Sequence, residues 1–185
     1  VFFDEVRVPV GNRVGEENKG WSYAKYLLEF ERGASFRASH LRRLADDLTE
    51  LGTSDGAGRA VEADPALELQ LARIHIDIDA LEMMEIRLLG DIQSGRNPGA
   101  VSSILKLRGS EISQSLSRLG VELLGERSIV WERRRPLYGL NEPSLLPESE
   151  VAIVPAHLDG RARTIFGGSS EIQREIIAKH IVGVA

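Results

Sequence analysis

The stretch DPALELQLARIHIDIDALEMMEIRLLGDI, residues 64–92, decides the fold class of this 185-residue chain. Asp64 followed by Pro65 is typical of a helix start, because aspartate caps free N–H groups and proline suits the first helical position. Apolar residues then recur at helical spacing, at Leu67, Leu71, Ile74, Ile78, Leu81, Leu88 and Ile92. A second apolar stripe predicts that the helix is covered on two sides, and its members are Leu69, Ile76 and Met83.

Two more long helices are predicted, one on each side of this stretch. The earlier helix is marked by apolar steps of three and four residues through Ala24, Leu27, Leu28, Ala34, Ala38, Leu41, Ala45 and Leu48. The later helix runs from about Ala100 to Leu124. Its predicted inward-facing residues are Val101, Ile104, Ile112, Leu116, Leu119 and Leu123. Gly- and Ser-rich breaks at 52–58 and 94–99 separate the three helices.

The last third of the chain is predicted to hold a long loop and a shorter helix. The stretch from Arg135 to Arg161 holds four prolines and is too long for an ordinary connection, which indicates a functional or partner-covering loop. A last helix begins at Ser169 or Ser170, and its predicted apolar face is Ile172, Ile176, Ile177 and Ile181. We therefore expect an all-α fold, an antiparallel four-helix bundle.

The opening segment VFFDEVRVPV, residues 1–10, has a different pattern. Its apolar residues alternate with polar ones from position 4 onward, which predicts a half-buried strand, and no partner strand follows. We expect a short β remnant of an upstream domain in a fragment of a larger protein. On this interpretation, residues 1–20 are the end of a β-domain and a linker, and residues 21–185 are the helical domain.

Composition excludes several classes of function. A net charge of −5 provides no overall field to attract nucleic acid or an anionic membrane, and the local run 132–135 is interpreted as a solvated or ion-paired surface. The absence of cysteine excludes a disulfide scaffold, a thiol nucleophile and a cysteine-ligated metal, and it is compatible with a cytoplasmic location. No apolar run approaches the roughly 20 residues of a membrane span.

No metal site is expected, and common nucleotide and hydrolase motifs such as GxGxxG and GxSxG are absent. His75, Asp77 and Asp79 are spaced two residues apart, so a helix would point neighbouring members to different sides. Surface or capping roles are the default for His40, His157 and His180.

Glu31 is a candidate general base, because it falls on the apolar stripe of the first long helix. A carboxylate there is costly unless it is paired or lines a cavity, and burial would raise its pKa towards the range of a useful base. The alternative is a core glutamate bonded to an arginine, such as Arg32. Glu29 should point elsewhere and serves as an internal control.

The segment TIFGGSSEIQRE, residues 164–175, is a candidate binding loop. Gly167 and Gly168 precede a helix whose free N–H groups could bind an anion or a developing oxyanion. Alternatively, the glycines only relieve crowding and a serine only caps the helix.

Taken together, these segments resemble the acyl-CoA dehydrogenase family over essentially the whole chain. FFDEVRVPVGNRVGEENKGW (2–21) looks like the end of the family's middle β-domain and the entry to its C-terminal helical domain. RTIFGGSSEIQREIIAKHIVG (163–183) looks like its active-site loop and last helix, and LSRLGVELLGERSIV (116–130) like the glycine turn between them.

The resemblance implies an FAD-dependent dehydrogenase of lipid metabolism. In that family, a glutamate removes the α-proton of an acyl-CoA thioester while the β-hydrogen leaves as hydride to the flavin. A backbone N–H of the active-site loop holds the thioester carbonyl. Members usually form tetramers and pass electrons to an electron-transfer flavoprotein.

The resemblance also nominates site residues. Many members read Tyr-Glu-Gly-Thr in the loop, and that Glu is the base, but this chain has Phe166-Gly167-Gly168-Ser169. A minority carries the base in a Glu-Arg pair on the first bundle helix, and this chain has Glu31-Arg32 there. We therefore expect Glu31 to be catalytic, with Arg32, Phe166 and Gly167 at the substrate.

The implied FAD contacts are Gly125, Ser169 and Glu171, although Glu171 is often Gln in the family. The family's flavin-binding Gln would match Val121. Its Arg-x-x-Phe-Gly segment would fall at SDGAGRAV (54–61), which keeps only Gly58. These departures keep two alternatives open: a non-catalytic subunit of a heteromeric dehydrogenase, or a flavin-dependent oxidase or monooxygenase. The assembly would be a homotetramer or heterotetramer, and the isolated fragment should not turn over substrate or bind FAD stably.

Overall fold

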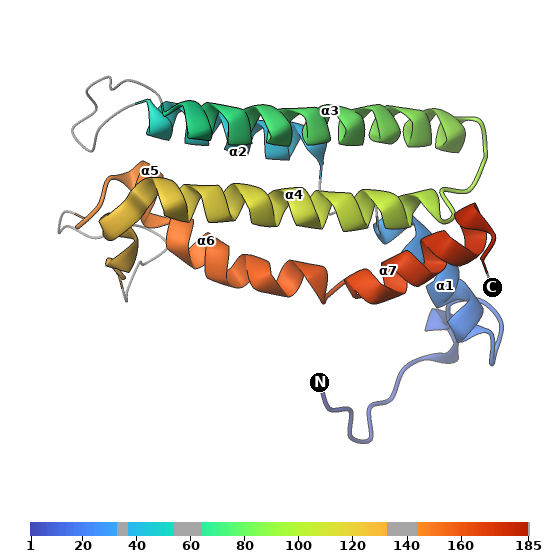
Figure 1. Cartoon of the computed structure of the whole chain (residues 1–185). Helices are drawn as coiled ribbons and strands as arrows, with labels where there is room; N and C mark the ends of the chain where they lie inside the picture. The colour runs from blue at the N-terminus through green and yellow to red at the C-terminus, as the bar shows by residue number, and fades with distance from the viewer. Residues whose placement is uncertain (33–36, 54–63, 133–143, 185) are drawn as a thin grey trace.

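The computed structural model describes residues 1–32, 37–53, 64–132 and 144–184, and it confirms the all-α fold class (Figure 1). The α-helices are α1 Gly20–Glu31, α2 Ala38–Gly52, α3 Pro65–Gln93, α4 Val101–Leu124, α5 Glu148–Val151, α6 Ile153–Asp159 and α7 Ser170–Ile177. Short 3₁₀ or π turns complete the set: η1 Val10–Asn12, η2 Gly125–Ile129, η3 Gly160–Thr164 and η4 Ala178–Val182.

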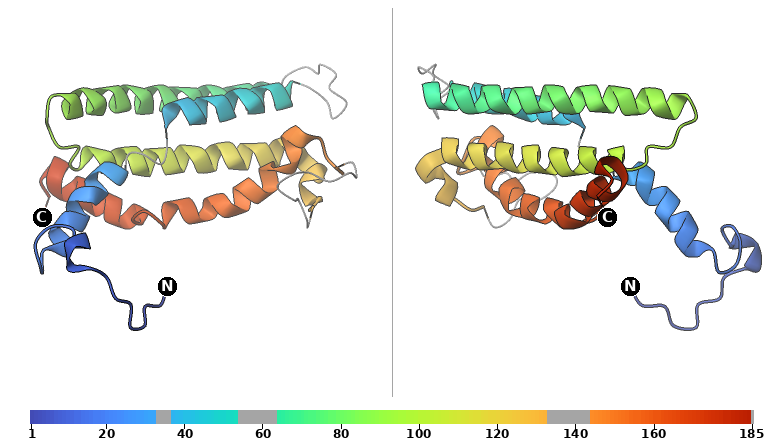
Figure 2. Two further views of the ribbon diagram at one scale, coloured as in Figure 1. Left: turned by 180° about the vertical axis from the view of Figure 1, so that it is seen from behind. Right: turned by 45° about the vertical axis from the view of Figure 1, so that its right-hand side comes forward.

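The helices form an antiparallel bundle in which α4 is central. α2, α3 and α4 contact one another, while α6 and α7 follow each other along α4 and together occupy the fourth position (Figures 1 and 2). Burial of apolar surface between α2, α3 and α4 stabilises this arrangement. The core is formed by Ala38, Leu41, Ala45, Leu48, Leu67, Leu71, Ile74, Ile78, Leu81, Leu88, Leu105, Ile112, Leu116 and Leu119.

Small residues on α4 allow its neighbours to approach closely. A Cβ placed on Gly120 would lie 3.0 Å from Ile153 Cγ2 and 3.2 Å from Leu48 Cδ2, so the glycine lets α2 and α6 meet the same part of α4. Several other small residues are buried along this helix, namely Ser102, Ser103, Gly109, Ser110 and Ser113.

Two helix starts are stabilised by carboxylates. Asp64 Oδ1 accepts a hydrogen bond from Ala66 N–H at 2.9 Å, which confirms the predicted cap of α3. The start of α2 is capped from another helix, since Glu85 on α3 accepts from Ala38 N–H at 3.2 Å and 3.3 Å. Desolvation is the main effect on Glu85 and raises the pKa of its carboxyl, against the backbone hydrogen bond.

The first predicted helix is in fact two helices. α1 ends at Glu31, and Arg37 has extended backbone angles before α2 begins at Ala38. Spacing of apolar residues does not reveal such a break, because the same periodicity resumes on its far side. Ala34 lies outside the described residues, as do Gly58 and the basic residues 133–135.

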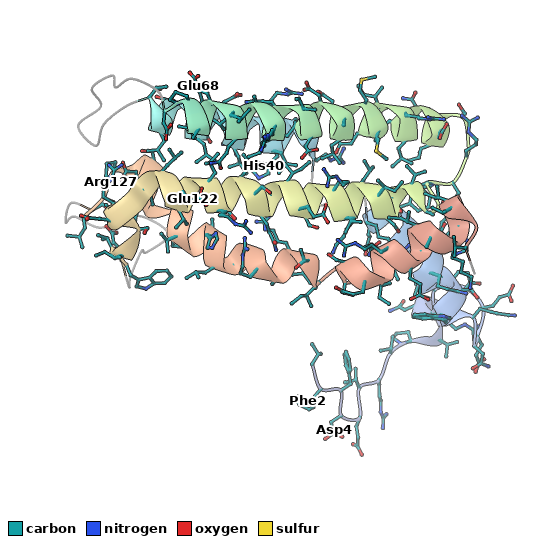
Figure 3. All side chains as sticks on the ribbon, in the orientation of Figure 1. Phe2, Asp4, His40, Glu68, Glu122 and Arg127 are labelled. Carbon is teal, nitrogen blue, oxygen red and sulfur yellow. The ribbon has the colours of Figure 1, made fainter. Side chains whose placement is uncertain are left out.

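The expected strand at residues 1–10 is not formed, and the described residues contain no strand. The segment is exposed and lies away from the helices, with Phe2 and Asp4 far from the bundle (Figure 3). A strand needs a hydrogen-bonded neighbour, and the described residues offer none.

The prediction of an irregular stretch from Arg135 to Arg161 is wrong from Glu148 onward, where α5, α6 and η3 are helical. Pro147 precedes α5, and Pro155 lies in the first turn of α6. Neither proline breaks a helix, because the first N–H groups of a helix have no partner within it.

The predicted apolar face of α7 is only partly correct, since Ile176 and Ile177 are half-buried. Its buried residues are Ser170 and Gln173, whereas Ile172 and Ile181 are about half exposed. The fully buried positions of this helix are therefore small or polar. None of the helices in the described part of the chain combines the length and apolar character of a membrane span.

Candidate functional site

A loop with two left-handed glycines connects η3 to α7. Gly167 has φ +65° and Gly168 has φ +91°, conformations that residues with a side chain rarely adopt. A Cβ on Gly168 would lie 2.4 Å from the side-chain nitrogen of Gln173, whereas one on Gly167 would meet nothing within 4 Å. A side chain at Gly168 would therefore displace the Gln173 amide in addition to straining the backbone, whereas Gly167 leaves open space at the surface of the loop.

Two buried polar side chains hold this loop in place. Lys106 on α4 donates from Nζ to the carbonyl oxygen of Gly168 at 2.6 Å. Gln173 donates from Nε2 to the same oxygen at 3.2 Å and to the carbonyl oxygen of Gly167 at 3.4 Å. The two residues are 2% and 0% exposed, so the loop geometry is fixed from inside the protein.

The ammonium group of Lys106 lies beneath the loop in an unfavourable environment for charge. Desolvation by burial lowers the pKa of Lys106, and the carboxylate of Glu171 acts in the opposite direction. Neither Lys106 nor Gln173 is predicted as a site residue from the sequence pattern. One signal for the burial of Lys106 is present in the sequence. Its neighbours on the helix include Ser102, Ser103 and Ser110, which are small enough for tight packing.

The loop presents hydrogen-bond donors to solvent. Gly167 is exposed, and its N–H donates to no atom of the described residues. Ser169 caps α7 by accepting from Ile172 N–H at 3.5 Å, as expected from the sequence. Such a loop at a helix start suits a carbonyl or anionic oxygen.

Glu171 is exposed on the first turn of α7. Its own backbone N–H, the Ser169 hydroxyl, Arg174 and Lys106 all lower the pKa of its carboxyl, so the group is ionised at neutral pH. A carboxylate at this position disfavours a second anion nearby. Phe166 precedes the glycines with its ring half exposed, and its N–H donates to Ala162 O at 3.0 Å.

An ion-pair chain fixes α7 to the bundle. Arg174 on α7 pairs with Glu111 on α4 at 2.9 Å, and Glu111 pairs with Arg108 at 2.8 Å. Arg108 also pairs with Asp77 on α3 at 2.7 Å. The helix that follows the glycine loop is thus connected to two bundle helices. The carboxylates near His75 are engaged by arginines, and the described ranges hold no group of three or more potential metal ligands.

The burial expected for Glu31 is wrong. Glu31 is exposed and the control residue Glu29 is half-buried, the reverse of the expectation. The reason is that no residue of α1 is buried, so the apolar stripe of this helix has no cover within the described chain. Arg32 is half-buried, and its N–H donates to Leu28 O at 3.3 Å.

The C-terminal end of α1, which holds Glu31, nevertheless lies on the same side of the bundle as α7. α1 contacts α4, and its C-terminal end lies beside the start of α4, close to α7 (Figures 1 and 2). Gly125 is at the other end of α4, where it is exposed with φ +52°. Within one chain, Gly125 is therefore not brought together with Gly167, Ser169 and Glu171.

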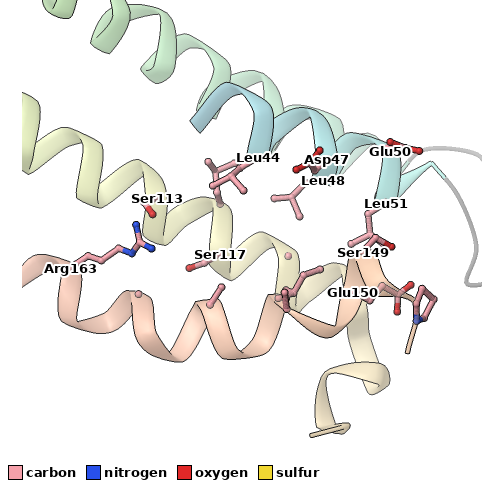
Figure 4. Close-up of a pocket in the computed structure, with 17 residues that line it drawn as sticks. Leu44, Asp47, Leu48, Glu50, Leu51, Ser113, Ser117, Ser149, Glu150 and Arg163 are labelled. Atoms are coloured by element: carbon pink, nitrogen blue, oxygen red, sulfur yellow. The ribbon is translucent and has the colours of Figure 1, made fainter. Parts of the chain in front are cut away.

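A separate cavity of about 670 Å³ lies between α2, α4, α5 and α6 (Figure 4). Leu44, Leu48 and Leu51 from α2 lie on one side of it, and Ile153 and Ala156 from α6 also line it. Arg163 lies at one end, and Ser149 and Glu150 lie at the other. None of the residues nominated from the sequence lines this cavity.

Residues 18–182 match the family described as acyl-CoA dehydrogenase, C-terminal domain. The chain is 29% identical over 188 residues to acyl-CoA dehydrogenase FadE26 of Mycobacterium tuberculosis, which covers 99% of this chain and 44% of that protein.

Two solved structures are also similar. The crystal structure of the ChsE4–ChsE5 complex from Mycobacterium tuberculosis matches with a TM-score of 0.75 and 30% identity, over 100% of this chain and 46% of that one. The FAD complex of PigA shares the fold, with a TM-score of 0.72 and 19% identity, over 97% and 43% of the two chains. The chain thus spans less than half the length of these relatives.

Proposed function

Because the chain belongs to the acyl-CoA dehydrogenase family, we propose that it is the C-terminal domain of an FAD-dependent enzyme that dehydrogenates an acyl-CoA thioester between its α and β carbons. The observation that carries this proposal is the rigid glycine loop. It presents the free N–H of Gly167 while Lys106 and Gln173 fix its carbonyl groups from beneath.

The Gly167 N–H donates a hydrogen bond to the thioester carbonyl oxygen. Removal of the α-proton shifts negative charge onto that oxygen, and a fixed donor stabilises the charge more as it develops. The lack of a side chain at Gly167 leaves room for a wide acyl group, and the exposed ring of Phe166 offers apolar contact beside it.

Glu31 is the proposed base. Its carboxylate accepts the α-proton, the β-hydrogen leaves with its electron pair, and the carbon–carbon double bond forms. FAD, when bound, supplies the acceptor for that hydride. Arg32 follows Glu31 at the substrate end of α1, as the resemblance implies.

A base of this kind works best in a site without bulk water. α1 exposes large apolar side chains, including Trp21, Tyr26 and Leu27, the last two at 60% and 56%. We propose that parts of the enzyme corresponding to the additional length of its relatives cover this face and enclose Glu31. The same cover would complete the acyl pocket.

FAD fits the residues of this chain only in part. The Ser169 hydroxyl and the amide groups before α7 are suitable partners for the cofactor, and Gly125 offers an exposed turn for a neighbouring subunit's cofactor. The ionised Glu171 does not suit a pyrophosphate. The proposed partners are the acyl-CoA substrate, an electron-transfer flavoprotein and further subunits in a tetramer.

A non-catalytic subunit of a heteromeric dehydrogenase is the second candidate. The carboxylate of Glu171 favours it, as does the likeness to one chain of the ChsE4–ChsE5 complex. The test uses the full-length protein: its FAD content, and the rate of flavin reduction by a panel of acyl-CoA esters, are measured for wild type, Glu31→Gln and the matched control Glu29→Gln.

The catalytic proposal requires flavin in the purified protein and a loss of reduction by at least about a thousandfold in Glu31→Gln, with Glu29→Gln close to wild type. Equal rates in the Glu31 variant and wild type would eliminate Glu31 as the base. Protein that is colourless when pure would support the assembly-subunit function instead.

A further inference from the structure

The cavity between α2, α4, α5 and α6 combines an apolar wall with a lining of small residues. Its volume of about 670 Å³ lies within the range of sites for small molecules, and protein interiors seldom leave so much space unfilled. The apolar wall comes from Leu44, Leu48 and Leu51 of α2 (Figure 4). The small residues that line the cavity are Ser113, Ser117, Ala152, Ala156 and Gly160. Their lack of bulk keeps the cavity open.

One buried hydroxyl group in this lining has no protein partner. Ser113 is 8% exposed and lines the cavity, and the described residues give its hydroxyl no hydrogen bond. By contrast, the hydroxyls of Ser110 and Ser117 on the same helix donate to carbonyl oxygens three residues earlier, at 2.9 Å and 3.0 Å. A buried hydroxyl without a partner is costly, so the Ser113 hydroxyl indicates that a ligand supplies a polar group at this point.

A cationic side chain lies at the same end of the cavity as Ser113. Arg163 extends from η3 towards that serine (Figure 4). The start of η3 is held against α4, because Gln114 Nε2 donates to the carbonyl oxygen of Gly160 at 3.1 Å. A guanidinium group has several N–H donors and can serve more than one partner. Together with a hydroxyl, it suits a carboxylate.

The opposite end of the cavity is acidic. Glu150 lies there, is 3% exposed and pairs with Arg127 at 2.8 Å, and Glu50 also lines the cavity. A second anionic group of a ligand would be repelled at this end. The ligand that fits therefore carries one carboxylate, and the rest of it is apolar. A coenzyme A ester does not fit, because its phosphate groups carry several negative charges.

We propose that this cavity binds a monocarboxylic acid with an apolar body, whose carboxylate lies at Ser113 and Arg163 and whose body packs against the leucines of α2. The site is separate from the glycine loop, since no residue from 164 to 175 lines the cavity. Binding of the acid does not depend on the proposed reaction.

Three probes with the same chain and different head groups test the ligand class. In isothermal titration calorimetry with the full-length protein, decanoate should bind, and decylammonium should bind at least about tenfold more weakly. Ser113→Ala should weaken decanoate binding by about threefold to tenfold. Arg163→Gln should weaken it by about tenfold or more and leave the binding of 1-decanol unchanged, while Arg163→Lys retains most of it. Equal losses for decanoate and 1-decanol in Arg163→Gln would show a purely structural role and overturn the proposal.

Filling the cavity tests where the acid binds. Ala156→Phe places a ring in the cavity from an exposed position of α6, so it should abolish decanoate binding and leave both the thermal midpoint and flavin reduction by acyl-CoA unchanged. The matched control, Ala72→Phe, lies on the side of α3 where the apolar stripe of Leu69, Ile76 and Met83 is exposed and not covered as the sequence predicts. This control should bind decanoate like wild type.

Decanoate binding that survives Ala156→Phe unchanged, or no decanoate binding in wild type, would overturn the proposal. Calorimetry measures binding without turnover, so a protein that fails to reduce flavin still gives a clear result for this cavity.

Discussion

Lys106 Nζ lies 2.6 Å from the carbonyl oxygen of Gly168, so the central helix places a buried cation directly beneath the glycine loop. A buried, positively charged lysine is costly unless the contact serves a purpose. The proposed purpose is to hold the Gly167 N–H at the position of the substrate carbonyl. If so, Lys106 contributes to the geometry of the loop and not to the free energy of unfolding.

Replacing Lys106 with methionine should therefore reduce catalysis without reducing stability. The variant removes the hydrogen bond to Gly168, while Gln173 still satisfies that carbonyl and methionine fills a similar volume. We expect flavin reduction in the full-length protein to slow by about tenfold or more, with kcat affected more than KM. The free energy of unfolding, measured in urea, should stay equal or rise. Lys25→Met, an exposed lysine on α1, is the control.

The free energy of unfolding should depend on pH in the alkaline range because of Lys106. Burial lowers its pKa below the ordinary 10.5, so the unfolded chain holds this proton more tightly than the folded chain. Between the lowered pKa and 10.5 the unfolded state binds more protons, and the free energy of unfolding contributed by this group rises with pH. Urea titrations from neutral to alkaline pH should show this rise in wild type relative to Lys106→Met. A difference between the two proteins that does not change with pH would contradict the assignment.

The two loop glycines should differ in their tolerance of alanine. Gly168→Ala places a Cβ 2.4 Å from Gln173 Nε2 at φ +91°, so Gln173 must move. We expect a loss of about 2–3 kcal/mol in the free energy of unfolding. Gly167→Ala has open space around its Cβ and carries only the left-handed strain, about 1 kcal/mol. Thermal or urea unfolding of the pair measures the difference, and equal losses would argue against the Gln173 contact.

Removing the cap that α3 provides to α2 should weaken the junction between these helices. Glu85→Ala leaves the Ala38 N–H at the start of α2 without its carboxylate acceptor, and we expect a loss of about 0.5–2 kcal/mol in the free energy of unfolding. Glu122→Ala, at an exposed position of α4, is the control and should change stability by less than about 0.5 kcal/mol.

The 185-residue chain on its own should not bind FAD tightly. Gly125 lies at the C-terminal end of α4, whereas Ser169 follows the loop that Lys106 contacts near the start of α4, and Glu171 presents a negative charge to any phosphate. Equilibrium dialysis of the isolated chain with FAD should give binding far short of one equivalent at micromolar concentrations. Stoichiometric, tight binding would contradict this expectation.

Much of the fold follows from local sequence. The sequence predicts α3 and α4 nearly to their ends, because the apolar periodicity of a long helix and the Gly- or Ser-rich breaks beside it can be recognised from the local sequence alone. The junction between Glu31 and Ala38 was missed, since the apolar spacing continues across it. The helical segment from Glu148 was missed because its prolines lie where a helix start tolerates them.

The candidate site was predictable only in part. The glycine pair and a serine cap are local features and are predicted from the sequence, which leaves the choice between Ser169 and Ser170 open until the structure shows Ser169. Lys106 and Gln173 were missed because their burial arises only when α4 and α7 pack together. The burial of Glu31 was inferred from an apolar stripe whose cover is not among the described residues. Local pattern shows that a face is apolar, and only tertiary structure shows what lies on it.

The division of the fourth bundle position between α6 and α7 has a consequence for amide exchange. The segment that includes α6 borders a cavity on its α2 side, whereas Lys106 and the Arg174–Glu111 pair connect α4 to the glycine loop and to α7. Transient opening should therefore begin at α5 and α6 and stop at the glycines, so deuterium should enter α6 well before α7. The glycine loop would then keep its conformation while the neighbouring segment opens locally.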